Sequence, residues 1–347
     1  MKNRKTGYRI AERTILTVLC VVLGLLLAVL IGATVYAQHL LGRMNYVEPD
    51  ATVPTLSAEE IAQFENETDP VDLETEFTAP AMDAEDVDFG DGPQQQIGGD
   101  DIVNILLIGQ DSSSGSRARS DTMILCTFNK KANTITLTSF MRDLYLKIPG
   151  YKSNRINASY HFGGMQLLND TLYENFGVEV DGNVEVNFRR FEDVIDILGG
   201  VTLELTSAEA AFVNQFTPGS YVCAGVNHLT GPQALSYARN RNDVDGDFSR
   251  TNRQRKLINA LIEEYKNKKV TEMLGILSDI LPLITTDMSK SDITAYAVQL
   301  FPMLETAEIK TQCIPAADAY RGATIDGMSV LVPDLEKNIE ILADSLT

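Results

Sequence analysis

The stretch Asn104-Ile-Leu-Leu-Ile-Gly-Gln-Asp111-Ser-Ser-Ser-Gly-Ser-Arg117-Ala-Arg119-Ser-Asp121 decides how the rest of the chain is interpreted. Its apolar run, Ile105 to Ile108, ends at Gly109 and predicts a buried strand. Two carboxylates and two guanidiniums then follow in a polar loop. They do not suit a core, because each charge would have to be desolvated and paired. They suit a divalent cation held by oxygen ligands beside arginines that bind phosphate. The loop therefore predicts a site for a pyrophosphate and its metal.

The N-terminal residues have the pattern of a membrane anchor. Ile15 to Ala37 contains no charged residue and is long enough for a helix that crosses a bilayer, which needs about 20 residues. Basic residues in positions 1–14 predict that this end stays in the cytoplasm and that the chain after Gln38 lies outside the cell. A cleaved signal peptide is the alternative, because Ala33 to Ala37 weakly resembles a cleavage site. We expect a cytoplasmic tail (1–14), one transmembrane helix (15–37) and an exported domain held at the cell membrane.

Residues 38–100 have a different composition. No Lys or Arg occurs between Arg43 and Arg117, whereas Asp and Glu recur with scattered Pro. Such a segment cannot bury enough apolar area to offset the entropy of ordering, so we expect a disordered acidic linker outside the cell. Its acids account for much of the formal net charge of -19. An acidic chain without a basic stripe does not indicate nucleic-acid binding.

Residues 101–347 are numerous enough for a sizeable core. Strands are expected at 102–108, 123–128, 134–138, 144–148, 184–186, 201–205 and 309–314. Helices are expected at 164–176, 188–198, 232–238, 250–265, 271–281, 289–301 and 334–346. Helices that alternate with strands predict an α/β fold, in which helices cover both faces of a sheet.

Other kinds of site find little support in the sequence. The four cysteines lack the spacing of a zinc site, and whether Cys223 and Cys313 join outside the cell stays open. No Walker A or Gly-x-Gly-x-x-Gly element indicates a nucleotide, and the run Ser112 to Ser114 lacks the Gly-x-Ser-x-Gly pattern of a nucleophile.

Further arginines follow an expected strand (Arg142), follow an expected helix (Arg239 and Arg241) or open the next expected helix (Arg250 and Arg253). On the expected helix 250–265, Arg250, Arg253 and Gln254 are three and four residues apart and share one face. A guanidinium binds phosphate with a planar bidentate fork, so the set as a whole predicts a pyrophosphate site. For any one arginine, a surface ion pair with a neighbouring acid, such as Arg142 with Asp143, is the alternative.

Several blocks in this order and spacing resemble the LytR-CpsA-Psr family of membrane-anchored cell-envelope proteins. They are the opening stretch, Met141-Arg-Asp143, Arg155-Ile-Asn-Ala-Ser-Tyr160, Val186-Asn-Phe188 through Leu198-Gly-Gly-Val201, Leu229-Thr-Gly-Pro-Gln-Ala-Leu-Ser-Tyr-Ala-Arg-Asn-Arg241 and Gly246-Asp-Phe-Ser-Arg-Thr-Asn-Arg-Gln254. One departure is Met141, where the family usually has Pro. The resemblance implies a mixed β-sheet flanked by helices around an apolar pocket for a prenyl chain.

The resemblance also implies a function. A glycopolymer of the teichoic acid or capsular polysaccharide type would pass from a polyprenyl-pyrophosphate carrier to a peptidoglycan hydroxyl, with the help of Mg²⁺. The alternatives are hydrolysis of the polyprenyl pyrophosphate, with water as the acceptor, and a non-enzymatic envelope sensor or transcriptional attenuator.

Roles for individual residues follow from the same resemblance. It implies that Asp111 and Asp121 bind the metal. It implies that six other residues hold or act on the pyrophosphate: Arg119, Arg142, Arg239, Arg241, Arg250 and Gln254. Arg117 and Arg253 join the pyrophosphate-binding set from the residue pattern. The expected catalytic set is Arg119, Arg142, Asp121 and Asp143, in which Asp121 or Asp143 would help to deprotonate the acceptor.

Overall fold

The computed structural model of the chain describes residues 36, 38–48, 61, 79–93, 96–110, 120–242, 246–266 and 270–346. The chain divides into two compact units, Met1–Met44 and Asn45–Thr347. The predicted transmembrane helix, 15–37, lies outside the described residues apart from Tyr36. Within the described ranges, no helix has both the length and the apolar character needed to span a membrane. The features discussed below belong to the second unit.

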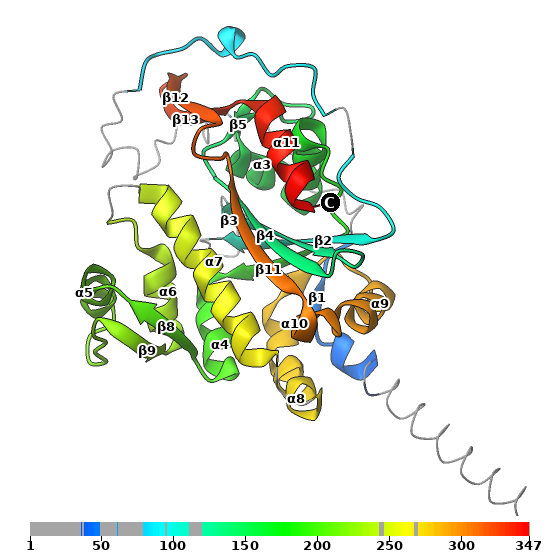
Figure 1. Cartoon of the computed structure of the whole chain (residues 1–347), viewed down its shortest axis with the longest axis vertical. Coiled ribbons are helices and arrows are strands. Elements are labelled where there is room, and N and C mark those ends of the chain that lie inside the picture. The colour runs from blue at the N-terminus through cyan, green and yellow to red at the C-terminus, as the bar shows by residue number, and fades with distance from the viewer. Residues whose placement is uncertain are drawn as a thin grey trace, which may run out of the picture. The chain divides into compact units, whose positions relative to one another are not determined.

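A seven-stranded mixed sheet forms the centre of this unit (Figure 1). Its order is β1 (Asn45–Tyr46), β10 (Thr285–Thr286), β7 (Gly182–Asn187), β2 (Ile102–Gln110), β3 (Ser120–Asn129), β4 (Thr134–Phe140) and β11 (Glu308–Ile314). β3 runs antiparallel to both of its neighbours, while β7 and β11 pair in parallel with β2 and β4. The end of β2, the start of β3 and the end of β4 therefore meet at one edge of the sheet, and the predicted mixed α/β fold is confirmed.

Helices cover both faces of the sheet, as expected (Figure 1). On one face lie α3 (Ile156–Phe176) and α11 (Leu335–Leu346). On the other lie α4 (Phe188–Leu198), α6 (Gly231–Arg239), α7 (Gly246–Tyr265), α9 (Lys290–Leu300) and α10 (Met303–Thr306). The remaining helices are α5 (Ser207–Phe216), α8 (Val270–Ile280) and the 3-10 turns η1 (Ala84–Asp86) and η2 (Leu281–Leu283). Three two-stranded pairs complete the unit: β5 (Tyr145–Leu146) with β6 (Asn154–Arg155), β8 (Val201–Leu205) with β9 (Gly225–Leu229), and β12 (Tyr320–Ile325) with β13 (Met328–Pro333).

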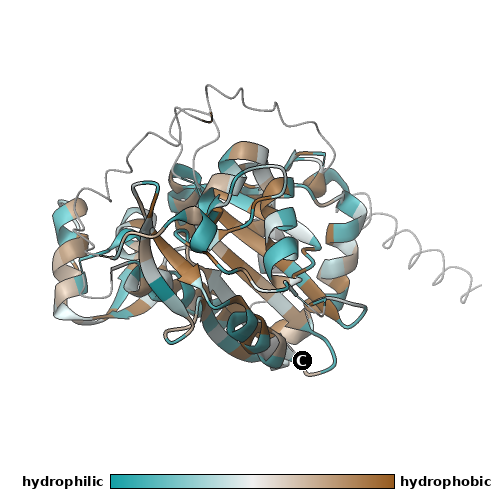
Figure 2. Cartoon of the chain, turned by 90° about the horizontal axis from the view of Figure 1, so that it is seen from above, coloured by the Kyte–Doolittle hydropathy of each residue, from teal (hydrophilic) through white to brown (hydrophobic). Residues whose placement is uncertain are grey.

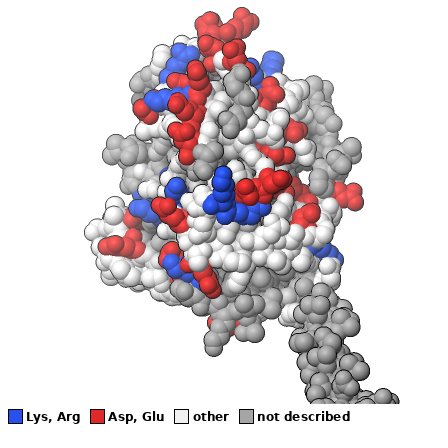
Figure 3. Space-filling view, turned by 45° about the vertical axis from the view of Figure 1, so that its right-hand side comes forward, with Lys and Arg blue, Asp and Glu red and all other residues white. Residues whose placement is uncertain are grey.

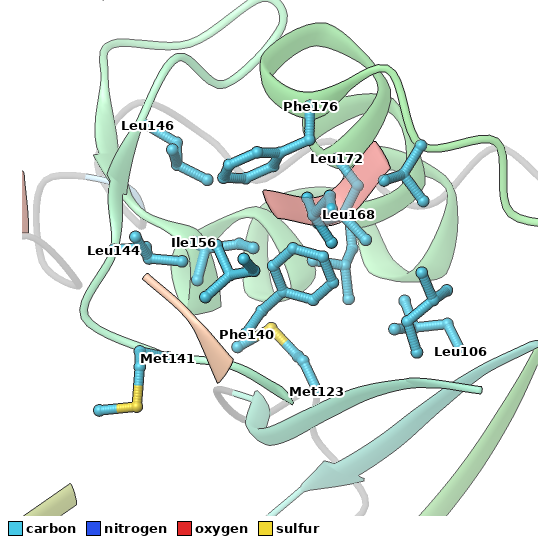
Figure 4. Close-up of a cluster of buried hydrophobic side chains, with 14 of the residues drawn as sticks. Leu106, Met123, Phe140, Met141, Leu144, Leu146, Ile156, Leu168, Leu172 and Phe176 are labelled. Carbon is cyan, nitrogen blue, oxygen red and sulfur yellow. The ribbon is translucent and has the colours of Figure 1, made fainter. Parts of the chain in front are cut away.

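The largest hydrophobic cluster lies between the sheet and α3. Leu106, Met123 and Phe140 come from three adjacent strands, and Figure 4 shows Phe140 among the side chains of α3. The Phe140 ring lies 5.5 Å from that of Phe176, measured between centroids. Because helices bury both faces, the central strands β2 and β3 contain long apolar runs, and Figure 2 shows brown strands inside the more hydrophilic helices. This core fixes the strand ends that carry the site.

Part of the range predicted as a disordered linker is ordered. Ala81 bridges to Thr324, and Ile97 bridges to Val178 while its N–H donates to the Gly177 carbonyl at 2.7 Å. Val87 and Ile97 are buried in hydrophobic clusters. The acidic composition concealed these apolar anchors, and the folded domain supplies the backbone partners that composition cannot indicate.

Other elements also differ from the sequence prediction. α3 begins at Ile156 rather than at Gly164, because the helix continues across a kink where Gly164 has φ 66° and ψ -152°. Residues other than glycine rarely adopt that backbone conformation. Gly164 therefore permits the kink, and it also interrupts the helical pattern in the sequence. α5 and the β12–β13 hairpin were not predicted, and Leu144 to Ile148 forms only the short strand β5.

Candidate functional site

Arginines and aspartates from several elements meet at the edge where β2, β3 and β4 end or begin. Asp121 lies at the start of β3, and Arg142 and Asp143 follow β4 directly. The other members come from β6, from the segment after α6 and from the start of α7. We call this set the charged cluster: Asp121, Arg142, Asp143, Arg155, Arg241, Asp247 and Arg250. The structure thus brings together residues from Asp121 to Arg250, a stretch that covers about half of the folded domain's sequence.

The buried guanidinium of Arg142 lies at the centre of the charged cluster. Its Nη1 is 3.1 Å from Asp121 Oδ1, and its Nε is 3.4 Å from Asp143 Oδ2 and 3.3 Å from Asp247 Oδ2. Only 4% of its side chain is exposed. An unpaired charge at such a position would be strongly destabilising, so the carboxylates around Arg142 compensate for its burial.

Asp247 is a second centre, which the sequence analysis did not identify. Its Oδ1 lies 3.3 Å from Arg241 Nε and 3.1 Å from Arg250 Nη1, in addition to the contact with Arg142. Three guanidiniums therefore share one carboxylate in the first turn of α7. An acid in the first turn of a helix is common, because it interacts favourably with the helix dipole. The position of Asp247 in the sequence therefore did not mark it as a site residue.

Arg155 is the other member that the sequence analysis missed. Its Nε lies 3.6 Å from Asp143 Oδ1 and donates a hydrogen bond to the carbonyl of Ser329 at 3.0 Å. The contact with Ser329 ties the charged cluster to the β12–β13 hairpin. Arg155 stands in one of the blocks quoted above, which carried no sign of its role.

The carboxyl groups of Asp143 and Asp247 both contact Arg142, and they titrate differently. Burial raises the pKa of Asp143, but Arg142 and Arg155 outweigh it, so the net pKa lies below the ordinary value. Burial raises the pKa of Asp247 to about 6, against the opposing effect of Arg142 and with help from the Asp143 charge. Below about pH 6, one carboxyl therefore carries a proton beside one that does not, as expected for two neighbouring acids.

The charged cluster has the composition of an anion site. Four guanidiniums and three carboxylates leave it with a net positive charge. Elsewhere on the molecule, the face drawn in Figure 3 has basic and acidic side chains interspersed. Within the described residues, Nε and Nη1 of Arg250 and Oδ1 of Asp247 are buried and form no hydrogen bond, although Nη1 and Oδ1 form an ion pair at 3.1 Å. Guanidinium donors that form no hydrogen bond within the protein are suited to phosphate oxygens.

An apolar cavity of about 230 Å³ lies beside the charged cluster, between the sheet and helices α4, α6 and α7. Its walls include Val184, Phe191 and Leu257, and its polar lining includes Arg239 and Gln254. The guanidinium of Arg239 stacks over the Phe188 ring at 4.6 Å from the centroid. Gln254 is on α7, four residues after Arg250. The site therefore fits a molecule with an anionic head and a hydrocarbon chain.

The structure places Arg253 apart from the charged cluster, although the sequence pattern grouped it with Arg250. Its Nε lies 2.8 Å from Glu209 Oε1, and its Nη1 donates to the Asn240 carbonyl at 2.9 Å. Arg253 and Glu209 are both buried, and Glu209 belongs to the capping box at the start of α5. Arg253 therefore fixes the backbone of Asn240, the residue directly before Arg241.

Three predicted site residues, Asp111, Arg117 and Arg119, lie outside the described residues. Asp121 brings one carboxylate to the cluster, and carboxylate oxygens are ligands that Mg²⁺ prefers. Among the described residues, no group of three His, Cys, Asp or Glu side chains is placed to hold a metal. The magnesium site therefore stays a prediction. Cys223 is exposed, Cys313 is partly buried, and both are free thiols.

The sequence is similar to those of known proteins. The sequence is 36% identical over 195 residues to the polyisoprenyl-teichoic acid–peptidoglycan teichoic acid transferase TagU of Bacillus licheniformis, covering 55% of this chain and 62% of TagU. It is 30% identical over 224 residues to the regulatory protein MsrR of Staphylococcus aureus, covering 64% of this chain and 67% of MsrR. The match to TagU thus spans less than two thirds of that relative.

A solved structure shows the same fold. YwtF (TagT) of Bacillus subtilis, a LytR-CPS2A-psr family protein with bound octaprenyl pyrophosphate lipid, matches with a TM-score of 0.56 and 26% identity. The match covers 75% of this chain and 98% of that one. The sequence also matches the LytR_cpsA_psr family over residues 68–344, which is most of the chain. The chain belongs to the LytR_cpsA_psr family.

Proposed function

We propose that the protein transfers a glycopolymer from a polyprenyl-pyrophosphate carrier to a hydroxyl of peptidoglycan outside the cell membrane. The observation that carries this proposal is the position of a largely buried arginine–aspartate cluster beside an apolar cavity. The name of TagU and the lipid bound to TagT support the same class of substrate. The glycopolymer is of the teichoic acid or capsular polysaccharide type.

The arginines bind the pyrophosphate in this proposal. Arg239 lies at the cavity, where the lipid meets its head group, and Arg142, Arg241 and Arg250 lie in the charged cluster. Without substrate, the cluster arginines pair with aspartates. A pyrophosphate offers charged oxygens that guanidiniums bind in a bidentate manner, and fixed guanidiniums stabilise the charge that develops on the leaving phosphate.

Mg²⁺ binding is proposed for Asp111 and Asp121. A bound Mg²⁺ would neutralise phosphate oxygens and so favour attack on phosphorus. Asp121 Oδ1 lies 3.1 Å from Arg142 Nη1, which places this carboxylate next to the arginines that would bind the same phosphates.

The reaction we propose is a displacement at phosphorus. A hydroxyl oxygen of the acceptor attacks the sugar-proximal phosphorus and forms a new P–O bond. The bond between that phosphorus and the bridging oxygen breaks, and polyprenyl phosphate leaves. The acceptor proton passes to a carboxylate, for which the sequence suggested Asp121 or Asp143. We assign it to the pair of Asp143 and Asp247, because a pKa of about 6 at Asp247 is better matched to proton transfer near neutral pH than a lowered one.

A transfer assay with labelled lipid-linked donor and peptidoglycan tests the proposal. Arg241→Ala and Asp121→Ala should each lower transfer by about 10²–10³-fold, the effect of removing a group that stabilises the transition state. Arg321→Ala, an exposed arginine on β12, is the matched control and should retain activity. Full transfer by both cluster variants would refute the site assignment.

The same assay separates the other functions. A native protein that releases polyprenyl phosphate and free glycopolymer, with none attached to peptidoglycan, would be a hydrolase with water as the acceptor. MsrR carries the name of a regulatory protein. Envelope phenotypes that persist in the Arg241→Ala variant would favour such a non-enzymatic role.

A further inference from the structure

A second apolar cavity lies at the far end of α7. It has a volume of about 240 Å³ and is formed by the end of α4, the C-terminal half of α7, α8 and α10. Its lining is half-buried or exposed, and Leu277 on α8 is 42% exposed. Apolar side chains around an open groove leave hydrocarbon surface in water, which is unfavourable. The groove therefore has the character of a site that another apolar group covers.

The two cavities follow each other along the same helices. On α7, Gln254, Leu257 and Ile258 line the first cavity. Leu261, Ile262 and Tyr265 line the second, and this spacing continues one helical face. On α4, the first cavity is lined by Phe191 and Val194 and the second by Leu198. In Figure 1, α8 lies beyond the end of α7 that is farthest from the charged cluster.

An octaprenyl chain is longer than the two cavities together. From Gln254 to Tyr265 the path along α7 is about 16 Å at 1.5 Å per residue. An isoprene unit adds four backbone bonds, which span about 4–5 Å when extended. The two cavities together therefore hold about three or four isoprene units. The octaprenyl chain bound to TagT has more, so a chain of that length would extend past Leu277.

We propose that the groove between the end of α7 and α8 is the point at which the prenyl tail leaves the protein and enters the lipid bilayer. This inference rests on the proposed function. A hydrocarbon chain that leaves an apolar groove requires another apolar surrounding, which the bilayer provides. Lys266 lies in the same lining, and a lysine can place its apolar stem in hydrocarbon and its charged end in water.

Tryptophan fluorescence tests the contact with the bilayer. The chain contains no Trp, so Leu277→Trp introduces a single reporter at the groove. Tyr173→Trp is the matched control, because Tyr173 is 52% exposed on α3, which covers the opposite face of the sheet. The full chain is placed in nanodiscs whose phospholipids carry brominated acyl chains. Leu277→Trp should lose most of its fluorescence and Tyr173→Trp should not. Equal signals from both variants would overturn the proposal.

Chain-length dependence tests the groove as a lipid site. Geranyl pyrophosphate has two isoprene units and ends within the first cavity, whereas octaprenyl pyrophosphate enters the second. A Trp at Leu277 or at Ile280 narrows the groove, so octaprenyl pyrophosphate should bind at least about tenfold more weakly while geranyl pyrophosphate is unaffected. Two positions are used so that a folding defect in one variant does not decide the result.

The outcomes separate the two proposals. In one outcome, the native protein binds both geranyl and octaprenyl pyrophosphate, and the Trp variants bind octaprenyl pyrophosphate as tightly as the native protein does. This result would overturn the groove assignment alone. Native protein that binds neither length would overturn the proposed function and this inference with it. Equal weakening of both lengths would show that the substitutions act on the first cavity, which also contradicts the proposal.

Discussion

Replacing Asp247 by Asn should stabilise the free protein at neutral pH while it abolishes transfer. Two effects oppose each other at this carboxyl. The ion pairs with Arg142, Arg241 and Arg250 favour the charged form, whereas burial and the Asp143 charge disfavour it. The pKa rises from 3.8 to about 6, so burial and repulsion prevail. A rise of about two units corresponds to about 3 kcal/mol against the charged form in the folded protein.

The sign of the pH dependence follows from proton binding. The folded protein holds the Asp247 proton more tightly than the unfolded chain, so its stability falls as the pH rises from about 4 to about 6. Asp143 has a lowered pKa, so its contribution to the stability of the folded protein is lost only under more acidic conditions. Asn resembles the protonated acid and its amide can donate to Asp143. The variant should therefore be more stable than the native protein by up to about 3 kcal/mol at pH 7.5, and by less at pH 4.5.

Guanidinium chloride unfolding of both proteins at pH 4.5 and pH 7.5 measures this difference. The transfer rate of Asp247→Asn should fall by about 10²–10⁴-fold if the Asp143–Asp247 pair accepts the proton. A variant that is less stable than the native protein at pH 7.5 would refute the reasoning, because it would show that the ion pairs outweigh the cost of burial.

Two further substitutions test the framework around the site. Arg253→Ala should destabilise the protein by about 3–5 kcal/mol, because it leaves Glu209 buried without its partner. Thermal unfolding measures this loss, and the added change Glu209→Gln should restore part of it; no recovery would contradict the pairing. Phe140→Ala should destabilise by about 3–5 kcal/mol, since the ring is 2% exposed and packs on Phe176. Denaturant unfolding checks this value, and a loss below that of Val298→Ala, an exposed position on α9, would contradict the assigned core.

The sequence predicted those elements whose boundaries are set locally. α4 and β8 have the predicted limits, because Asn187 caps the helix start and Gly199 adopts the left-handed conformation at its end. The β12–β13 hairpin had an equally local signal, the pair Asp326-Gly327 with positive φ at both residues, which was overlooked. The capping box of Thr206 and Glu209 likewise marked the start of α5.

The site was predictable only in part. Arg142 and Asp143 follow a recognisable strand, but Asp247 joins them from a helix more than a hundred residues later. Arg250 and Arg253 are three residues apart, which leaves their side chains about 60° apart around α7. That angle is sufficient for one to contact Asp247 and the other Glu209. Spacing in the sequence therefore grouped two arginines that the fold separates.

The sequence alone determined the family resemblance, the alternation of helices and strands, and the types of side chain available for a pyrophosphate. These depend on local patterns, which act before the chain folds. Only the tertiary structure decided which charges share a buried site, which arginine supports the chain instead, and where the apolar cavities lie. Burial and the distances between charges arise when strand ends and helix starts from distant segments pack together, so neither can be obtained from residue order.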